Sequence, residues 1–190
     1  MKYDVILSGV GGQGVLSIAA IIARAAVLEG LSVRQSEVHG MAQRGGAVLA
    51  HLRISDGKIS CDLVPKGGAD IIISMEPLES LRYVSWLSPG GALVASTDPL
   101  VNISNYPDLK DVIASIKRLP LWRLVEAEKI AKKAGLAKAV NMVMVGASSR
   151  FLPVKQESLE KTIAGVFSTK SAETAGANVK AFQLGREAAS

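Results

Sequence analysis

Cysteine and histidine are scarce in this chain of 190 residues, which contains one cysteine, Cys61, and two histidines. A single thiol excludes an internal disulfide, and it excludes an iron–sulfur cluster held by four cysteines of this chain. With so few thiolate and imidazole ligands, we expect no metal site. The cysteine content is typical of a protein from a reducing compartment.

Long apolar runs and blocks of like charge are missing as well. No stretch approaches the roughly 18 apolar residues of a membrane span, and the opening MKYDVILSG places an acid and a glycine where a secretory signal needs an unbroken apolar run. The 22 Lys and Arg residues are spread along the chain, and the net charge is only +5. A basic tail for nucleic acid is therefore absent. We expect a cytoplasmic protein with neither a membrane nor a nucleic-acid partner.

Apolar residues make up 48% of the sequence and charged residues 21%, which is typical of a folded protein. The length favours one domain over residues 1–190. Residues 3–8 are apolar and β-rich, and they run into a glycine cluster that precedes a helical pattern over 14–30. Further strands are expected at 31–38, 45–55 and 90–97, and a strand followed by a helix is expected within 69–87.

The Asp-Gly pair at residues 56–57 is a typical hairpin signal, so we expect another strand at 59–64, paired with the strand before it. Alternating strands and helices predict a three-layer α/β sandwich, with a Rossmann-like mixed sheet that contains an antiparallel hairpin. Helices after Leu121 are expected to pack on this sheet, although the passage 117–129 leaves the bounds of a final strand open. The helical patterns cover residues 122–135, 139–151, 154–167 and 171–189.

Gly9, Gly11 and Gly14 form the pattern G-x-G-x-x-G between the first strand and the first helix, and Glu37 stands at the end of the next strand. In a dinucleotide site such glycines allow a tight turn and a close approach of the backbone to a pyrophosphate. A turn that only joins strand to helix explains the same pattern. No Lys-Ser or Lys-Thr follows the glycines, which excludes a Walker A loop.

A second unusual segment, EVHGMAQRGGAVLAHLR, covers residues 37–53. Its small and polar residues are poorly suited to filling a core, and loops beside strand ends commonly carry function. We therefore favour a functional loop over a simple connection in which Arg44 is solvated. Its candidate residues are His39, Gln43, Arg44, Gly45 and Gly46.

The other histidine, His51, alternates with leucines in an expected strand, so we interpret it as structural. No serine of the chain has the setting of a nucleophile elbow, and no set of nucleophile, base and orienting group is evident. The sequence thus offers a binding loop without catalytic groups of its own.

Five segments, in this order and over nearly the whole chain, resemble the gamma-type domain of the 2-oxoacid:ferredoxin oxidoreductases. The motif MAQRGG, inside the second of these segments, is specific, and the segments EPLESLR and NYPD favour the indolepyruvate group of that family. The five segments are GVGGQGV, EVHGMAQRGGAVLAHLR, ADIIISMEPLESLRYVSWLSPGG, AVNMVMVGA and NVKAFQLG.

The resemblance implies a complex that decarboxylates arylpyruvates oxidatively to aryl-acetyl-CoA and reduces ferredoxin. It places the thiamine diphosphate and the iron–sulfur clusters on a larger alpha subunit, with coenzyme A as cosubstrate. The sequence agrees, because it has no Gly-Asp-Gly signature for thiamine diphosphate. The chain is then expected to work in a hetero-oligomer and to be inactive alone.

On this interpretation the glycine cluster and the second loop meet at the carboxyl edge of the first strands and form a face for coenzyme A or for the partner subunit. A free-standing NAD(P)-dependent oxidoreductase and a non-catalytic scaffold subunit are the alternatives. The residues expected at this face are Gly9, Gly11, Gly12, Gln13, Gly14, His39, Gln43, Arg44, Gly45 and Gly46.

Overall fold

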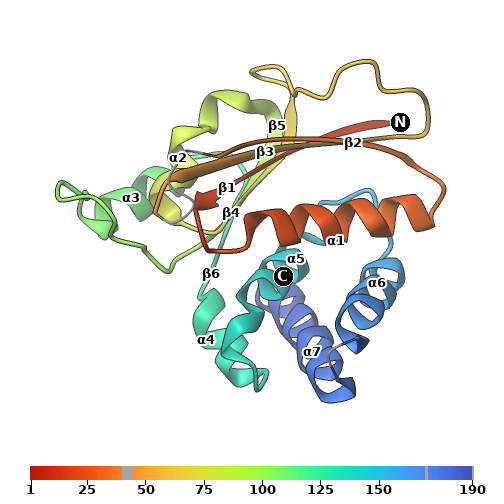
Figure 1. Ribbon diagram of the computed structural model, residues 1–190. Helices are drawn as coiled ribbons and strands as arrows, with labels where there is room; N and C mark the ends of the chain where they lie inside the picture. Colours follow the sequence, from red (N-terminus) through yellow and green to blue (C-terminus); the bar gives the residue numbers. More distant parts are fainter. Residues whose placement is uncertain (40–44, 170, 190) are drawn as a thin grey trace.

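A computed structural model describes residues 1–39, 45–169 and 171–189 of the protein. Six strands form one sheet in the order β2-β3-β1-β4-β5-β6 (Figure 1). Strands β1, β4, β5 and β6 run parallel, whereas β3 is antiparallel to both of its neighbours. The predicted mixed sheet is confirmed. The strands are β1 Lys2–Val10, β2 Ser32–His39, β3 Ala47–Ser55, β4 Ala69–Ser74, β5 Leu87–Ser96 and β6 Trp122–Val125.

Helices cover both faces of the sheet, as expected for three layers (Figure 1). Short 3₁₀ turns, η1 Val84–Trp86 and η2 Ala137–Ala139, complete the elements. One face carries α1 Val15–Leu28, α4 Ala127–Lys133, α5 Val140–Ser148, α6 Gln156–Ser168 and α7 Ala172–Ala188, and the other face carries α2 Pro77–Arg82 and α3 Leu109–Ile116.

Successive residues of the central strands point to opposite faces, so each strand contributes side chains to two hydrophobic cores, one on each face of the sheet. On β1, Val5 and Leu7 belong to the larger core under α1, α5 and α7, whereas Ile6 belongs to the smaller core under α3. All three side chains are fully buried, which explains the apolar run from Val5 to Leu7 in the middle of β1. The C-terminal helices share the larger core with the strands, and this confirms that they pack on the sheet.

The prediction of a strand at residues 59–64 is wrong. Both edges of β3 are occupied, one by β1 and the other by β2, so no edge is left for a further strand. The antiparallel hairpin of the sheet is instead β2–β3. Residues 59–64 are held by side chains of β3: Arg53 donates to the carbonyls of Cys61 and Leu63, at 3.0 and 3.1 Å, and His51 Nδ1 accepts from the Val64 N–H at 3.1 Å.

The helix expected at 122–135 is corrected at its start. Residues Trp122–Val125 pair with β5 as the edge strand β6, and the helix begins only at Ala127. Pairing with the open edge of β5 outweighs the helical pattern of these four residues. The helices expected further on are confirmed as α5, α6 and α7, whereas α3 was not predicted.

Two glycines permit the close crossing of α5 and α7. A Cβ on Gly146 would lie 1.9 Å from the Phe182 carbonyl oxygen, and one on Gly185 would lie 2.1 Å from the Val143 carbonyl oxygen. This contact of backbone with backbone buries Phe182 completely. In the described ranges, no helix is long and apolar enough to cross a membrane.

Candidate functional site at the carboxyl edge of the sheet

The glycine cluster lies where β1 ends and α1 begins, and its conformation requires glycine at several positions. Gly12 and Gly14 have φ angles of 101° and 82°, which other residues rarely adopt. A Cβ on Gly9 would lie 2.8 Å from Val15 Cγ2 and 3.0 Å from Met75 Cβ. The cluster therefore joins strand to helix through a turn that few other sequences can form.

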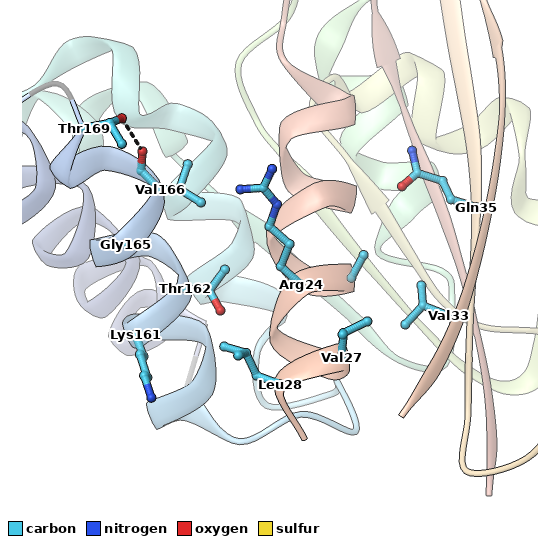
Figure 2. A pocket seen from close by; sticks show the side chains of 11 residues that line it. Arg24, Val27, Leu28, Val33, Gln35, Lys161, Thr162, Gly165, Val166 and Thr169 are labelled. Atoms are coloured by element: carbon cyan, nitrogen blue, oxygen red, sulfur yellow. Dashed lines mark hydrogen bonds between the residues drawn. The ribbon is translucent and has the colours of Figure 1, made fainter. Parts of the chain in front are cut away.

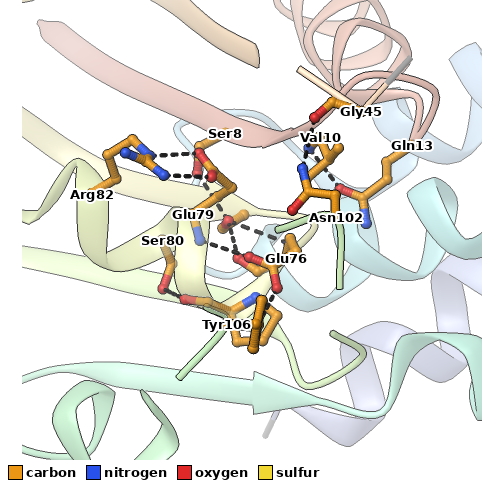
Figure 3. Close-up of polar contacts among 12 residues, drawn as sticks. Ser8, Val10, Gln13, Gly45, Glu76, Glu79, Ser80, Arg82, Asn102 and Tyr106 are labelled. Carbon is orange, nitrogen blue, oxygen red and sulfur yellow. Dashed lines mark hydrogen bonds and ion pairs between the residues drawn. The ribbon is translucent and has the colours of Figure 1, made fainter. Parts of the chain in front are cut away.

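Gln13 fixes this turn to the neighbouring strand ends. Its Oε1 accepts from the Val10 N–H at 2.8 Å (Figure 3), and its Nε2 donates to the Met75 carbonyl at 3.3 Å. Because the oxygen and the nitrogen of its amide both bind backbone groups, the Gln13 side chain links the end of β1 to the segment after β4.

The second loop reaches the glycine cluster, as the sequence predicted. The Gly11 N–H donates to the Gly46 carbonyl at 2.8 Å, and the Gly45 N–H donates to the Gly11 carbonyl at 3.3 Å. Gly45 has a φ of 81°, so glycine is required there too. His39 is the last residue of β2, and its backbone pairs opposite Val48. Gln43 and Arg44 lie outside the described residues.

A pocket of about 690 Å³ opens beside this contact, between the glycine cluster, the segment after β5 and the start of α5. One side of it favours an anion, because α1 follows the N-cap residue Gly14 with neither a side-chain cap nor an acid in its first turn. The lining residues are Gly12, Gln13, Gly14, Met75, Ser96, Asp98, Leu100, Glu128, Lys138, Val140 and Asn141.

The charged residues of the pocket differ in how they are held. Asp98 Oδ2 accepts from the Ser96 hydroxyl at 2.7 Å and from the Glu128 N–H at 2.9 Å, so this carboxylate caps the start of α4. Glu128 Oε2 lies 3.9 Å from Lys132 Nζ, one helical turn further along α4. Lys138 is exposed and has no ion pair within the part of the chain that the structure describes. Lys138 is therefore the available cation at the pocket rim.

Glu76, which sequence reasoning missed, is the central polar residue of this edge. Its side chain is 1% exposed, and it accepts from the Glu79 N–H at 2.7 Å, from the Leu100 N–H at 3.4 Å and from the Tyr106 hydroxyl (Figure 3). Burial, and then the hydrogen bond to this carboxylate, raise the pKa of Tyr106, so the phenol keeps its proton. Through its bonds to Leu100 and Tyr106, Glu76 holds the segment 97–108 against the carboxyl ends of the strands.

Asn102 extends the same network to the second loop. Its Nδ2 donates to the Gly45 carbonyl at 2.6 Å (Figure 3). The tied segment thus contacts the loop that contacts the glycine cluster. The segments NYPD and AVNMVMVGA served only as family markers in the sequence, yet they contain Tyr106 and Asn141 of this edge. The signal for Glu76 was an acid directly after an apolar strand and before a proline.

His51 is structural, as predicted. It is buried on β3, and its Nδ1 accepts the Val64 N–H. Burial, and then the charge of Arg53, lower its pKa, so the ring stays neutral. Because Nδ1 is the acceptor, the proton of the neutral ring is assigned to Nε2. No cluster of three His, Cys, Asp or Glu side chains suited to a metal ion occurs among the described residues.

The order of the strands removes the geometric basis for a dinucleotide site. In that fold the strand carrying the acidic residue is the direct parallel neighbour of the glycine-rich strand. Here β3 lies between β1 and β2, so Glu37 on β2 is two strands away from Gly9.

Solved structures of oxidoreductase subunits share this fold. The keto/oxoacid ferredoxin oxidoreductase gamma subunit from Geobacter sulfurreducens matches with a TM-score of 0.71 and 27% identity, over 98% of both chains. Pyruvate oxidoreductase subunit PORC from Thermotoga maritima matches with a TM-score of 0.74 and 25% identity, over 98% of this chain and 96% of that one.

Sequence comparison gives the family directly. Residues 4–188 match the family described as pyruvate ferredoxin/flavodoxin oxidoreductase, and the chain belongs to that family. It is 37% identical to indolepyruvate oxidoreductase subunit IorB of Archaeoglobus fulgidus, over 97% of this chain and 94% of the relative. It is 31% identical to 2-oxoglutarate synthase subunit KorC of Methanothermobacter marburgensis, over 98% and 96%. The resemblance seen in the sequence is confirmed.

Proposed function

We propose that this chain is the small subunit of a cytoplasmic 2-oxoacid:ferredoxin oxidoreductase that acts on indolepyruvate and other arylpyruvates. The observation that carries the substrate class is the identity to IorB subunits, 34–37%, against 30–31% to KorC subunits. The reaction is oxidative decarboxylation to the acyl-CoA with reduction of ferredoxin. Residues 1–190 act as one gamma-type domain of the complex.

The reacting cofactors belong to a larger alpha subunit in this proposal. Thiamine diphosphate supplies the carbanion chemistry at the 2-oxo carbon, and iron–sulfur clusters carry the electrons to ferredoxin. The only cysteine of this chain, Cys61, is exposed and lies at the opposite end of β3 from the glycine edge, so it fits no cluster of the usual four thiolates. This chain therefore contributes surface and position.

The carboxyl edge fits the phosphates of coenzyme A. The uncapped start of α1 offers backbone N–H groups, Gly12 has no side chain to block a close approach, and Lys138 adds a positive charge at the rim. Asp98 and Glu128 also line the pocket and repel an anion, so the phosphate is expected on the side of Gly12, Gly14 and Lys138. Gln13 and the segment tied by Glu76 hold the edge in shape. Arg44 is expected to add a bidentate contact to a phosphate or to a carboxylate of the partner.

The proposal is tested with the complex of this chain and its larger subunit, by measuring reduction of ferredoxin with indolepyruvate, pyruvate and 2-oxoglutarate. We expect kcat/KM to be at least tenfold higher for indolepyruvate, and no activity from this chain alone. A preference for 2-oxoglutarate would overturn the substrate class. Equal activity of the larger subunit without this chain would overturn its place in the enzyme.

Arg44 gives a second test of the same face. We expect both Arg44→Ala and Arg44→Lys to reduce complex formation or turnover strongly, because lysine keeps the charge but loses the planar fork. A loss with alanine alone indicates a simple requirement for charge. If both variants assemble and turn over like the wild type, the functional interpretation of the loop fails.

A further inference from the structure

A second hollow lies away from the carboxyl edge, and the proposed function makes no use of it. It has a volume of about 880 Å³ and is formed by α1, β2 and α6. Figure 2 shows α1 running between α6 and β2, with Arg24 and Leu28 turned toward α6 and Val27 toward β2. The lining residues are Ala23, Arg24, Val27, Leu28, Val33, Gln35, Lys161, Thr162, Gly165, Val166 and Thr169. We call this hollow the α1 groove.

The α1 groove leaves large apolar side chains open to water. Val27 is 59% exposed and Leu28 is 58% exposed, although both lie on a helix that otherwise packs into the core. A smaller hollow of about 200 Å³ continues along α1, and it shares Arg24 and Val166 with the groove. From Ser17 to Leu28 the two hollows follow α1 for about 16 Å, which is three helical turns. Exposed apolar side chains that line a hollow of this length can receive the apolar face of a partner helix.

The charges of the α1 groove have one sign. Arg24, between the two hollows, and Lys161, on α6, are both exposed, and no acidic side chain occurs among the described residues that line either hollow. An occupant with carboxylates opposite these two positions is therefore favoured over a neutral or basic one.

Gly165 indicates a close approach of another backbone. It lies inside α6, where glycine costs about 1 kcal/mol relative to alanine. Nothing lies within 4 Å of the position of a Cβ there, so no contact within the chain requires glycine. Because Gly165 faces the groove, the missing side chain leaves room for an occupant to lie against α6.

A second copy of this chain does not fit the charge pattern. Two copies related by a two-fold axis would bring this surface against itself. Arg24 and Lys161 of one copy would then face the same cations of the other, which is unfavourable.

We propose that an amphipathic helix with acidic residues, contributed by the larger subunit, lies in the α1 groove. Its apolar face covers Val27, Leu28 and Val166, and its carboxylates pair with Arg24 and Lys161. The inference rests on the proposed function, because it needs the larger subunit as partner. It adds a second contact surface, centred on the C-terminal half of α1, whereas the glycine edge lies at the start of that helix.

The experiment fills the α1 groove without touching the core. Gly165→Leu places a side chain where the structure leaves open space, and Gly176→Leu does the same on α7, outside the groove. Each full-length variant is titrated with the purified larger subunit. We expect Gly165→Leu to weaken binding at least tenfold and Gly176→Leu to change it less than twofold. Unfolding curves of both variants check that they fold.

The charge part of the proposal has its own pair of variants. We expect Arg24→Glu to weaken binding several-fold, with a loss that shrinks at high salt, whereas Lys180→Glu on the exposed face of α7 leaves binding unchanged. Hydrogen exchange of the wild-type complex is expected to slow at residues 23–28 and 161–169.

The outcomes separate the two proposals. If the wild-type chain binds the larger subunit and Gly165→Leu binds it equally well, the α1 groove proposal fails and the proposed function stands. If the wild-type chain does not bind the larger subunit, the proposed function fails and the groove proposal fails with it. If Gly165→Leu abolishes self-association of the chain instead, the occupant is a second copy and the groove proposal is overturned.

Discussion

Asp4 and Glu76 are buried carboxylates at opposite ends of the central strands, and they are held by different kinds of donor. At the amino end, Asp4 is fully buried. Its carboxylate accepts hydrogen bonds from Arg53 Nε at 2.7 Å and Nη2 at 3.1 Å, and the Lys2 ammonium lies 2.9 Å from its Oδ2. At the carboxyl end, Glu76 receives two backbone N–H groups and the Tyr106 hydroxyl. Asp4 is thus held mainly by cations and Glu76 by uncharged donors, although the neighbouring Glu79 on α2 pairs with Arg82 at 3.0 Å.

The difference lies in what each carboxylate joins. Arg53 is on β3, next to Asp4 on β1, and its other hydrogen bonds hold residues 61 and 63, so the charged pair locks two strands and a crossing segment together. Glu76 holds the segment 97–108 through the Leu100 N–H and the Tyr106 hydroxyl. Both carboxylates accept charge-assisted bonds, but only Asp4 has a bidentate arginine as partner, which adds geometric specificity as well as energy. The amino end is therefore built for global stability, and the carboxyl end holds a segment that can open locally.

The largest effect is expected at the amino end. Asp4→Asn leaves Arg53 without its carboxylate in a mostly buried position, so we expect a loss of about 3–5 kcal/mol in the free energy of unfolding, measured by urea denaturation. Asp56→Asn is the matched control, because Asp56 pairs with the exposed N-terminus and no measurable change is expected. Equal losses in both variants would show that burial of the pair is not what matters.

A smaller and more local effect is expected at the carboxyl end. Glu76→Gln keeps the shape of the side chain but replaces one carboxylate oxygen, a hydrogen-bond acceptor, with an NH2 group. This NH2 group then faces another donor. We expect a loss of about 1–3 kcal/mol. Amide exchange should become faster at Leu100 and nearby residues, and stay unchanged at the centre of β1. Faster exchange throughout the sheet would remove the contrast between the two ends.

The sequence predicted features whose causes are local and missed those whose causes are distant. The apolar run of β1 and the glycine turn depend on neighbouring residues, so both were predicted. The failed strand at 59–64 and the shortened helix before Ala127 depend on which sheet edges are free. Glu76 and Asn102 were missed as site residues because their partners Leu100 and Gly45 lie 24 and 57 positions away.

The stability of the folded chain is expected to depend on pH through His51. Burial lowers the pKa of this ring in the folded chain, so the unfolded chain takes up a proton more readily. The contribution of the neutral ring is complete above about pH 6.5, the ordinary pKa of histidine, and is lost as the pH falls below it. We expect wild-type stability to fall between pH 7 and 5. His51→Asn, which offers an oxygen acceptor near the position of Nδ1, should flatten that fall, and an unchanged slope would assign it to other groups.

The smallest effect is expected at the rim of the carboxyl-edge pocket. Lys138 is exposed, so its attraction to a phosphate is screened by water and contributes no more than about 1 kcal/mol. We expect Lys138→Met to raise the KM for coenzyme A about two- to fivefold in the assembled enzyme, with the KM for indolepyruvate and kcat unchanged. Lys133→Met, on the exposed end of α4 and outside the pocket, controls for a change in net charge. A rise in both KM values would indicate a change in assembly. An unchanged KM for coenzyme A would mean that the uncapped start of α1 and the glycine cluster do not place a phosphate within reach of Lys138, and that the carboxyl edge receives the partner subunit instead.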